Sequence, residues 1–293
     1  MHYSQGAGWR PLIDGESAML QVATGCSHNK CIFCDMYHKP FAVSPIDEIA
    51  ADIKELSTKT QRDTKRLFLT GGNSFCLPTE LLLDICALVR ESMPFIESIG
   101  CFARITDIKK KTNAELEALA KAGLGSISIG AESGLDKALA AVGKGFSAQD
   151  VIDQCARLDK VRMTYAFFYL LGIAGKGRGL DNARASAEVF GSVNPQVIMV
   201  HTMTRFEGTK LAHAVAEGKF KMASEKEMQQ ELREFCALYP KKTLINAAHF
   251  SNTISFIAQL PDERTELLDL IDKRIDLGDE EVLAQRRMQM QSI

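Results

Sequence analysis

Short apolar, β-rich runs alternate with helical patterns up to about residue 220, and this alternation limits the fold more than any other feature. The predicted strands are Met19–Ala23, Arg66–Thr70, Ser98–Phe102, Ser126–Gly130, Met163–Leu171 and Val197–Thr202. Successive strand–helix units require parallel strands, because each crossover returns the chain to the same end of the sheet. Six units rather than eight predict an α/β fold, an open, partial (β/α)6 TIM-like barrel. An open doubly wound sheet is the alternative.

Helix-start chemistry follows several of these strands. The segment "SPID" (44–47) offers Ser44 as an N-cap with proline at the first helical position. The segments "TNAE" (112–115) and "SEKE" (224–227) have the pattern of capping boxes, and "SAQD" (147–150) is a weaker version. Gly123 stands where the helix after residue 112 should end.

The pattern changes near residue 224, where a polar helix begins and the strand–helix alternation stops. We expect residues 1–223 to form the barrel core, and residues 224–293 to form a helical extension, a cap that closes its open side.

Composition narrows the class of protein. The 293 residues are 46% hydrophobic and 25% charged, with a net charge of −2 and eight cysteines. The sequence has no cationic stripe, which argues against nucleic acid as a partner, and we expect a small-molecule or peptide substrate. The apolar runs are too short for a membrane span, and the N-terminus lacks a secretory pattern. These features predict a cytoplasmic protein whose clustered thiols bind metal or act in catalysis.

Three of the cysteines crowd the loop after the first predicted strand, in "TGCSHNKCIFC" (24–34). A closed tetrahedral zinc site needs four ligands, and this loop offers three thiolates, from Cys26, Cys31 and Cys34. His28 or His38 could supply the fourth ligand. Three thiolates on a 4Fe–4S cluster would instead leave one iron open to an external ligand. Other unusual segments follow the next three strands, where parallel sheets gather ligands.

Taken together, the cysteine loop, an aromatic residue just before its last cysteine and a glycine pair after the second strand resemble the radical S-adenosylmethionine (SAM) superfamily. Most of that superfamily has three residues between the first two cysteines, whereas this chain has four, 27–30. The resemblance implies that Cys26, Cys31 and Cys34 hold a 4Fe–4S cluster, and that Phe33 lies near the adenine of SAM. Reduction of the cluster would then cleave SAM to a 5′-deoxyadenosyl radical that abstracts hydrogen from the substrate.

The same resemblance assigns SAM contacts to two further loops. In "TGGN" (70–73), Gly71 and Gly72 allow close backbone approach and Asn73 offers an acceptor, although paired glycines are also ordinary turn residues. In "AESG" (131–134), Glu132 and Ser133 resemble polar contacts to the ribose or methionine part of SAM; a surface carboxylate near a helix start is the alternative.

Each of the remaining candidate site residues could instead have an ordinary structural role. Arg104, after the third strand, suits a carboxylate of SAM or substrate, or a structural ion pair. His201, Arg205 and His249 are candidate catalytic or substrate-binding residues, or structural ones.

The sequence therefore predicts a radical SAM enzyme of unassigned substrate that receives electrons from a donor such as flavodoxin or ferredoxin. The alternative is a non-catalytic zinc- or iron–sulfur-binding protein on the same barrel. On the sequence alone, a bulky replacement of Gly72 should weaken SAM binding and leave the iron content intact.

Overall fold

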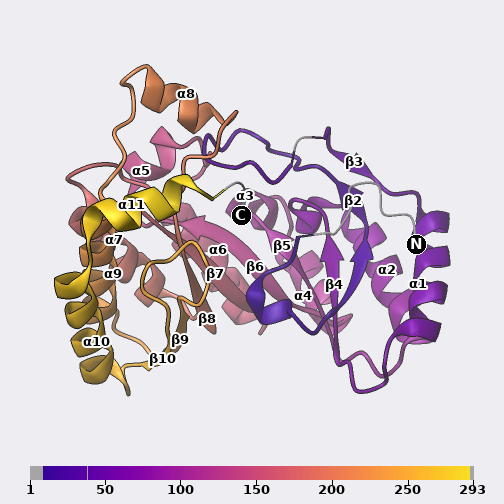
Figure 1. The fold of residues 1–293 in the computed structure, drawn as a ribbon. Helices are drawn as coiled ribbons and strands as arrows, with labels where there is room; N and C mark the ends of the chain where they lie inside the picture. Colours follow the sequence, from indigo (N-terminus) through magenta and orange to yellow (C-terminus); the bar gives the residue numbers. More distant parts are fainter. Residues whose placement is uncertain (1–8, 38, 291–293) are drawn as a thin grey trace. The chain divides into compact units, whose positions relative to one another are not determined.

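The computed structural model describes residues 9–37 and 39–290, and its class is α/β, as predicted (Figure 1). The chain divides into two compact units. The first unit comprises Met1–Asn29, Met36–Gly130 and Ala156–Tyr165, and the second comprises Lys30–Asp35, Ala131–Cys155 and Ala166–Ile293.

The first unit contains four parallel strands. In spatial order they are β1 (Ala18–Gln21), β4 (Arg66–Thr70), β5 (Ser98–Ala103) and β6 (Leu124–Glu132), whose last two residues belong to the second unit. A small antiparallel pair joins β2 (Ala23–Thr24) to β3 (Ala42–Val43). The helices are α1 (Ile46–Lys59), α2 (Thr79–Ser92), α3 (Ile105–Lys109) and α4 (Asn113–Lys121), with short 3-10 turns at Leu12–Asp14 and Ser74–Cys76.

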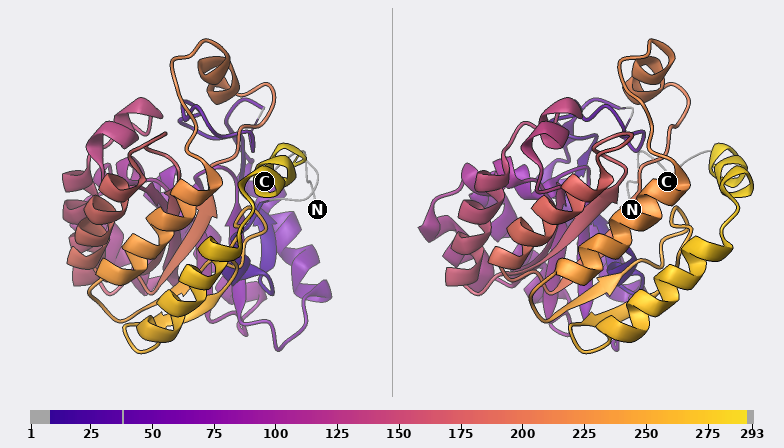
Figure 2. Two further views of the ribbon diagram at one scale, coloured as in Figure 1. Left: turned by 60° about the vertical axis from the view of Figure 1, so that its left-hand side comes forward. Right: turned by 90° about the vertical axis from the view of Figure 1, so that its left-hand side faces the viewer.

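In the second unit, strands β7 (Thr164–Leu171), β8 (Val197–Thr202) and β9 (Thr243–Asn246) are parallel, and β10 (Ile257–Leu260) is antiparallel to β9. The helices are α5 (Asp136–Ala141), α6 (Ala148–Lys160), α7 (Gly179–Ser192), α8 (Lys210–Ala216), α9 (Glu225–Leu238), α10 (Arg264–Leu277) and α11 (Glu280–Met288). Helix α6 and strand β7 cross the boundary between the units. Within the second unit, α9 lies beside α7 and α10 (Figure 2).

All six predicted strands are present, and two have the predicted bounds, Arg66–Thr70 and Val197–Thr202. The first predicted strand is split, because the chain leaves the main sheet after Gln21 and pairs with Ala42–Val43. The segment after residue 224 contains the expected helices and also β9 and β10, which the sequence did not indicate. Each of these strands has only four residues, too few for a clear alternation of apolar and polar side chains.

The predicted caps were right in most places. Thr112 and Ser224 both form complete capping boxes, and Gly123 ends the helix region at a φ of +95°. Ser147 also exchanges hydrogen bonds with Asp150 at the start of α6. The prediction for Ser44 was wrong: α1 begins at Ile46 with Pro45 as its N-cap, and no side chain caps it.

The two faces of β7 differ in what they contact. Phe167 and Tyr169 point toward the helices, where both pack on Phe190 of α7 and Tyr169 also stacks on Phe235 of α9. Because side chains alternate along a strand, Phe168 lies on the opposite face. The sequence left open which face was which, and the aromatic contacts with the helices decide it.

No helix within the described residues is both long enough and apolar enough to cross a bilayer.

Candidate cofactor site

The glycine loop after β4 lies directly against the start of the cysteine loop. The amide of Gly72 donates to the carbonyl of Gly25 at 2.8 Å. A Cβ atom on Gly72 would lie 2.6 Å from Cβ of Cys26 and 2.7 Å from its Cα, both far inside van der Waals contact. Gly25 has a φ of +67° and itself has no room for a side chain. Glycine at residue 72 is therefore required by the backbone that presents Cys26.

Asn73 fastens the same loop by its side chain. Its carbonyl oxygen accepts from the amide of Ser27 at 2.9 Å, and its NH₂ group donates to Ser27 Oγ at 2.7 Å and to Asp107 Oδ2 at 2.9 Å. Asn73 is fully buried. Both hydrogens of its NH₂ group are thus engaged within the protein.

Asp107 and Arg104 complete this cluster at the end of β5. Asp107 Oδ2 also accepts from the backbone amide of Arg104 at 2.9 Å, so Asp107 is the third helical residue of α3 and closes a capping box with Arg104. Burial raises the pKa of Asp107, and the hydrogen bond from Asn73 opposes that shift. The guanidinium of Arg104 donates to Thr106 Oγ1 at 2.8 Å. The sequence indicated Arg104 but missed Asp107, which lies three residues further along the chain.

The apolar residues of the cysteine loop pack within the second unit. Ile32 and Phe33 lie against a buried cluster that includes Val142, Leu170 and Leu211. The amide of Ile32 donates to the carbonyl of Val142 at 3.1 Å, and the carbonyl of Ile32 accepts from Leu211 at 2.8 Å. This half of the loop is thereby held by backbone hydrogen bonds on both sides.

Glu132 occupies an unusual turn at the end of β6. Its φ is +65°, and the amide of Ser133 donates to the carbonyl of Ala131 at 2.8 Å. A positive φ at the central residue of such a short turn defines a γ-turn of the rare, strained kind. The Glu132 carboxylate pairs with the buried ammonium of Lys144 at 3.2 Å. The sequence did not indicate Lys144.

Ser133, the other candidate in this loop, is buried and faces the protein interior. Its hydroxyl donates to Oδ1 of Asn182 and accepts from the amide of Leu135 at 2.8 Å. The side chain is thus engaged by α7 and by its own turn.

Of the three candidate catalytic residues, the structure brings two together. The rings of His201 and His249 stack with centroids 4.0 Å apart and 15° between planes, and Phe168 meets His201 edge-on at 5.1 Å. Burial lowers the pKa of His201 to about 3 and that of His249 to about 4, so both imidazoles are neutral at pH 7. Arg205 is exposed in the loop after β8.

Hydrogen bonds define the tautomer of His249. Its Nδ1 accepts from the amide of Ser251 at 3.3 Å and lies 2.8 Å from Ser251 Oγ. That hydroxyl accepts from the amide of Thr202 at 3.1 Å, which directs its own proton to Nδ1. The neutral ring therefore carries its proton on Nε2.

The three loop cysteines suit an iron–sulfur cluster by their chemistry. All three are half-buried cysteines that form no disulfide, and thiolates are the usual protein ligands of such clusters. The backbone cradle at Gly72, which a side chain would fill, holds the first of them. Among residues 9–37 and 39–290, no three His, Cys, Asp or Glu side chains converge on a preformed metal position. His38, a possible zinc ligand, lies outside the described residues.

Comparison with known proteins places this site in a family. The sequence profile of the Radical SAM superfamily matches residues 20–177, which include all three loop cysteines and the glycine loop. The match covers more than half of the chain, and the protein belongs to the radical SAM superfamily. No curated protein sequence matches the chain significantly.

Solved structures agree on the fold. The methyltransferase TsrM from Kitasatospora setae, with cobalamin and a [4Fe-4S] cluster bound, is 14% identical with a TM-score of 0.57. That alignment covers 69% of this chain and 37% of TsrM. A second TsrM structure, with tryptophan substrate and the SAM analogue aza-SAM bound, has the same identity and TM-score.

Two further structures have a TM-score of 0.55. Methylornithine synthase (PylB) is 17% identical over 94% of this chain and 82% of its own. Coproporphyrinogen III oxidase (HemN) from Escherichia coli, a radical SAM enzyme, is 15% identical over 75% and 51%. At these identities the likeness concerns the fold, and it confirms the predicted α/β architecture of the partial-barrel type.

Proposed function

We propose that the protein is a radical SAM enzyme that binds a 4Fe–4S cluster through Cys26, Cys31 and Cys34 and acts on a small-molecule or peptide substrate. The observation that carries the proposal is the family match across the cysteine loop, together with the glycine backbone packed on Cys26. When bound, the cluster and SAM supply a 5′-deoxyadenosyl radical for hydrogen abstraction from the substrate.

The first unit would hold the cofactors by its backbone. Gly71 and Gly72 are proposed to offer main-chain groups to SAM; at Gly72 the absence of a side chain lets this loop pack on Gly25 and Cys26. Asn73 supports this indirectly: its carboxamide bonds Ser27 and Asp107, so its proposed role is to fix the residue that follows Cys26. Arg104, at the end of β5, is the proposed partner of a carboxylate of SAM or substrate.

In the second unit, the paired charges of Glu132 and Lys144 suit the two ends of an amino acid. A carboxylate accepts from ribose hydroxyls or an ammonium group, and a lysine ammonium donates to a carboxylate. We propose Glu132 and Lys144 as SAM contacts on this ground, with Ser133 holding the turn between Glu132 and Leu135. Phe33 is proposed to lie beside the adenine.

The substrate side is proposed to include His201 and His249. Their neutral rings stack on the same side of the sheet as Phe168, and His249 carries a proton on Nε2. Neutral imidazoles donate and accept hydrogen bonds without adding charge, which suits an uncharged polar group on a substrate. Arg205, exposed beyond β8, is proposed to bind an acidic group of the substrate. The proposed electron source is a flavodoxin or ferredoxin.

Anaerobic turnover tests the proposal. The protein is reconstituted with iron and sulfide, reduced with dithionite and mixed with SAM, and the SAM fragments are identified by mass spectrometry. We expect 5′-deoxyadenosine and methionine in equal amounts. Methylthioadenosine would instead indicate transfer of the aminocarboxypropyl group. A colourless protein that binds zinc and no iron would favour the non-catalytic alternative.

A further inference from the structure

A buried carboxylate outside the family match stands at the centre of a hydrogen-bond network in the second unit. Glu231 of α9 has no exposed surface. Its Oε1 accepts from the hydroxyl of Tyr169 at 2.9 Å and from the NH₂ group of Asn182 at 2.6 Å, and its Oε2 accepts from the amide of Gly172 at 2.9 Å. Burial raises the pKa of Glu231 to about 7, against the effect of these three hydrogen bonds.

The network continues from Asn182 to the loop after β6. Oδ1 of Asn182 accepts from the hydroxyl of Ser133, which in turn accepts from the amide of Leu135. One turn along α7, the hydroxyl of Ser186 accepts from the amide of Gly134 at 2.8 Å. Two loops are thereby tied to one carboxylate: the loop after β6 through Asn182, and the loop after β7 directly through Gly172.

The loop after β6 is the one with the strained turn. The φ of Glu132 is +65°, a region that side chains other than glycine's seldom occupy. Such a strained conformation persists only where the surroundings enforce it. The bonds on Ser133, Gly134 and Leu135 enforce it from the C-terminal side, and Lys144 holds the Glu132 carboxylate.

We infer that Glu231 is a positioning residue that keeps the turn at Glu132 in its binding conformation, so that SAM affinity depends on a helix beyond the family match. The inference rests on the proposed function, because it takes Glu132 to be a SAM contact. It adds a role for α7 and α9, which start after residue 177, where the family match ends.

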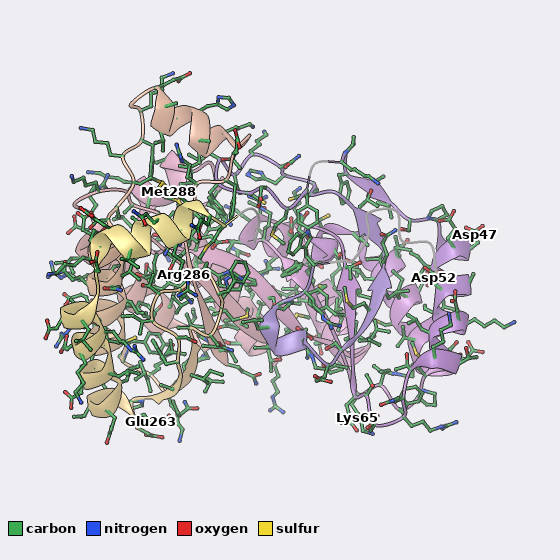
Figure 3. All side chains as sticks on the ribbon, in the orientation of Figure 1. Asp47, Asp52, Lys65, Glu263, Arg286 and Met288 are labelled. Atoms are coloured by element: carbon green, nitrogen blue, oxygen red, sulfur yellow. The ribbon has the colours of Figure 1, made fainter. Side chains whose placement is uncertain are left out.

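The test is Glu231→Gln in the full-length, reconstituted protein. Glutamine keeps the size of the side chain but presents one acceptor oxygen in place of two, so one of the three donors loses its partner. The matched control is Glu225→Gln, which removes a buried charge from the same helix and breaks the ion pair with Arg287 without touching either loop. Arg287 of α11 is buried. Its neighbours along the chain, Arg286 and Met288, are exposed (Figure 3).

The first readout is hydrogen exchange by mass spectrometry without SAM. We expect peptides over residues 131–135 and 171–173 to exchange about tenfold faster in Glu231→Gln than in Glu225→Gln, because one of the loop's anchors is lost. The second readout is SAM affinity at equal iron content, which we expect to fall about tenfold in Glu231→Gln only. Equal exchange in the two variants would overturn the inference.

The two readouts separate this inference from the proposed function. If the wild type binds a cluster but no SAM, the proposed function fails, while the exchange data still report on the loop. If the wild type binds SAM and Glu231→Gln binds it equally well, only the positioning role is refuted. Should Glu231→Gln not fold, Tyr169→Phe removes one donor and keeps the aromatic packing; Tyr239→Phe is its control. Tyr169→Phe should change exchange and affinity in the same direction, about two- to threefold.

Discussion

Replacing Gly72 with alanine tests how closely the glycine loop packs on the first cluster cysteine. The new Cβ would lie 2.6 Å from Cβ of Cys26, where ordinary contacts begin at 3.4 Å. The atoms must therefore separate by roughly 0.8 Å. Two of the three closest atoms, Cα of Cys26 and the carbonyl oxygen of Gly25, are backbone, so no flexible side chain can move aside.

The expected loss of stability in Gly72→Ala follows from the cost of overpacking. The φ of Gly72 is outside the left-handed region, so alanine causes no backbone strain there. The loss of stability comes from the steric clash alone. Forcing a methyl group into a packed site costs about 1–3 kcal/mol. For a protein of this size, the melting temperature should fall by roughly 2–10 °C. Because the displaced residue is Cys26, we also expect less bound iron, which revises the sequence-based expectation that iron content would be unaffected.

The assay combines thermal unfolding of the apo-protein with iron content after anaerobic reconstitution. Gly125→Ala in β6 is the matched control, since the nearest atom to its added Cβ is 4.0 Å away and its φ is also outside the left-handed region. Iron content and a melting temperature for Gly72→Ala that equal those of Gly125→Ala would refute the close packing of the loop on Cys26.

Three further perturbations follow from the site. Asn73→Ala removes three hydrogen bonds from a buried cluster and should lower the free energy of unfolding by about 1–3 kcal/mol in urea titration; an unchanged midpoint would contradict the fastening role. The pKa of buried His249 is about 4, against 6.5 when unfolded, so protonation favours unfolding as the pH falls. Between pH 6.5 and 4 the wild type should lose about 3 kcal/mol that His249→Gln does not lose, and parallel pH profiles would disprove this. Cys31→Ala should abolish iron binding and the brown absorbance near about 400 nm, whereas a full iron load would remove Cys31 from the ligand set.

Much of the fold could be predicted because its signals are local. Apolar β-rich runs separated by helix-start residues located six strands, β1 and β4 to β8, and the capping boxes at Thr112 and Ser224 lay where four consecutive residues predicted them. Where a local signal was weak, prediction failed. Ser44 does not cap α1, and the four-residue strands β9 and β10 have too short a pattern to detect.

The candidate site was also predictable only where its residues are neighbours along the chain. The spacing of Cys26, Cys31 and Cys34 and the glycine pair at 71–72 are visible in the sequence, because neighbours along the chain form each motif. The partners of these motifs are distant along the chain. Asn73 bonds Ser27, which is 46 residues away, and Asp107, which is 34 residues away. A lone asparagine carries no signal of which groups its amide will meet.

The sequence by itself therefore determined the α/β class, the cysteine loop and the family, since periodicity and spacing are properties of short segments. Only the tertiary structure decided which groups meet: Lys144 with Glu132, His201 with His249, and the Glu231 carboxylate with Tyr169, Asn182 and the backbone amide of Gly172. Burial then shifted the pKa values of several of these groups. It lowers the pKa values of the two histidines and raises that of Glu231, because a charged form loses its hydration when the chain folds around it.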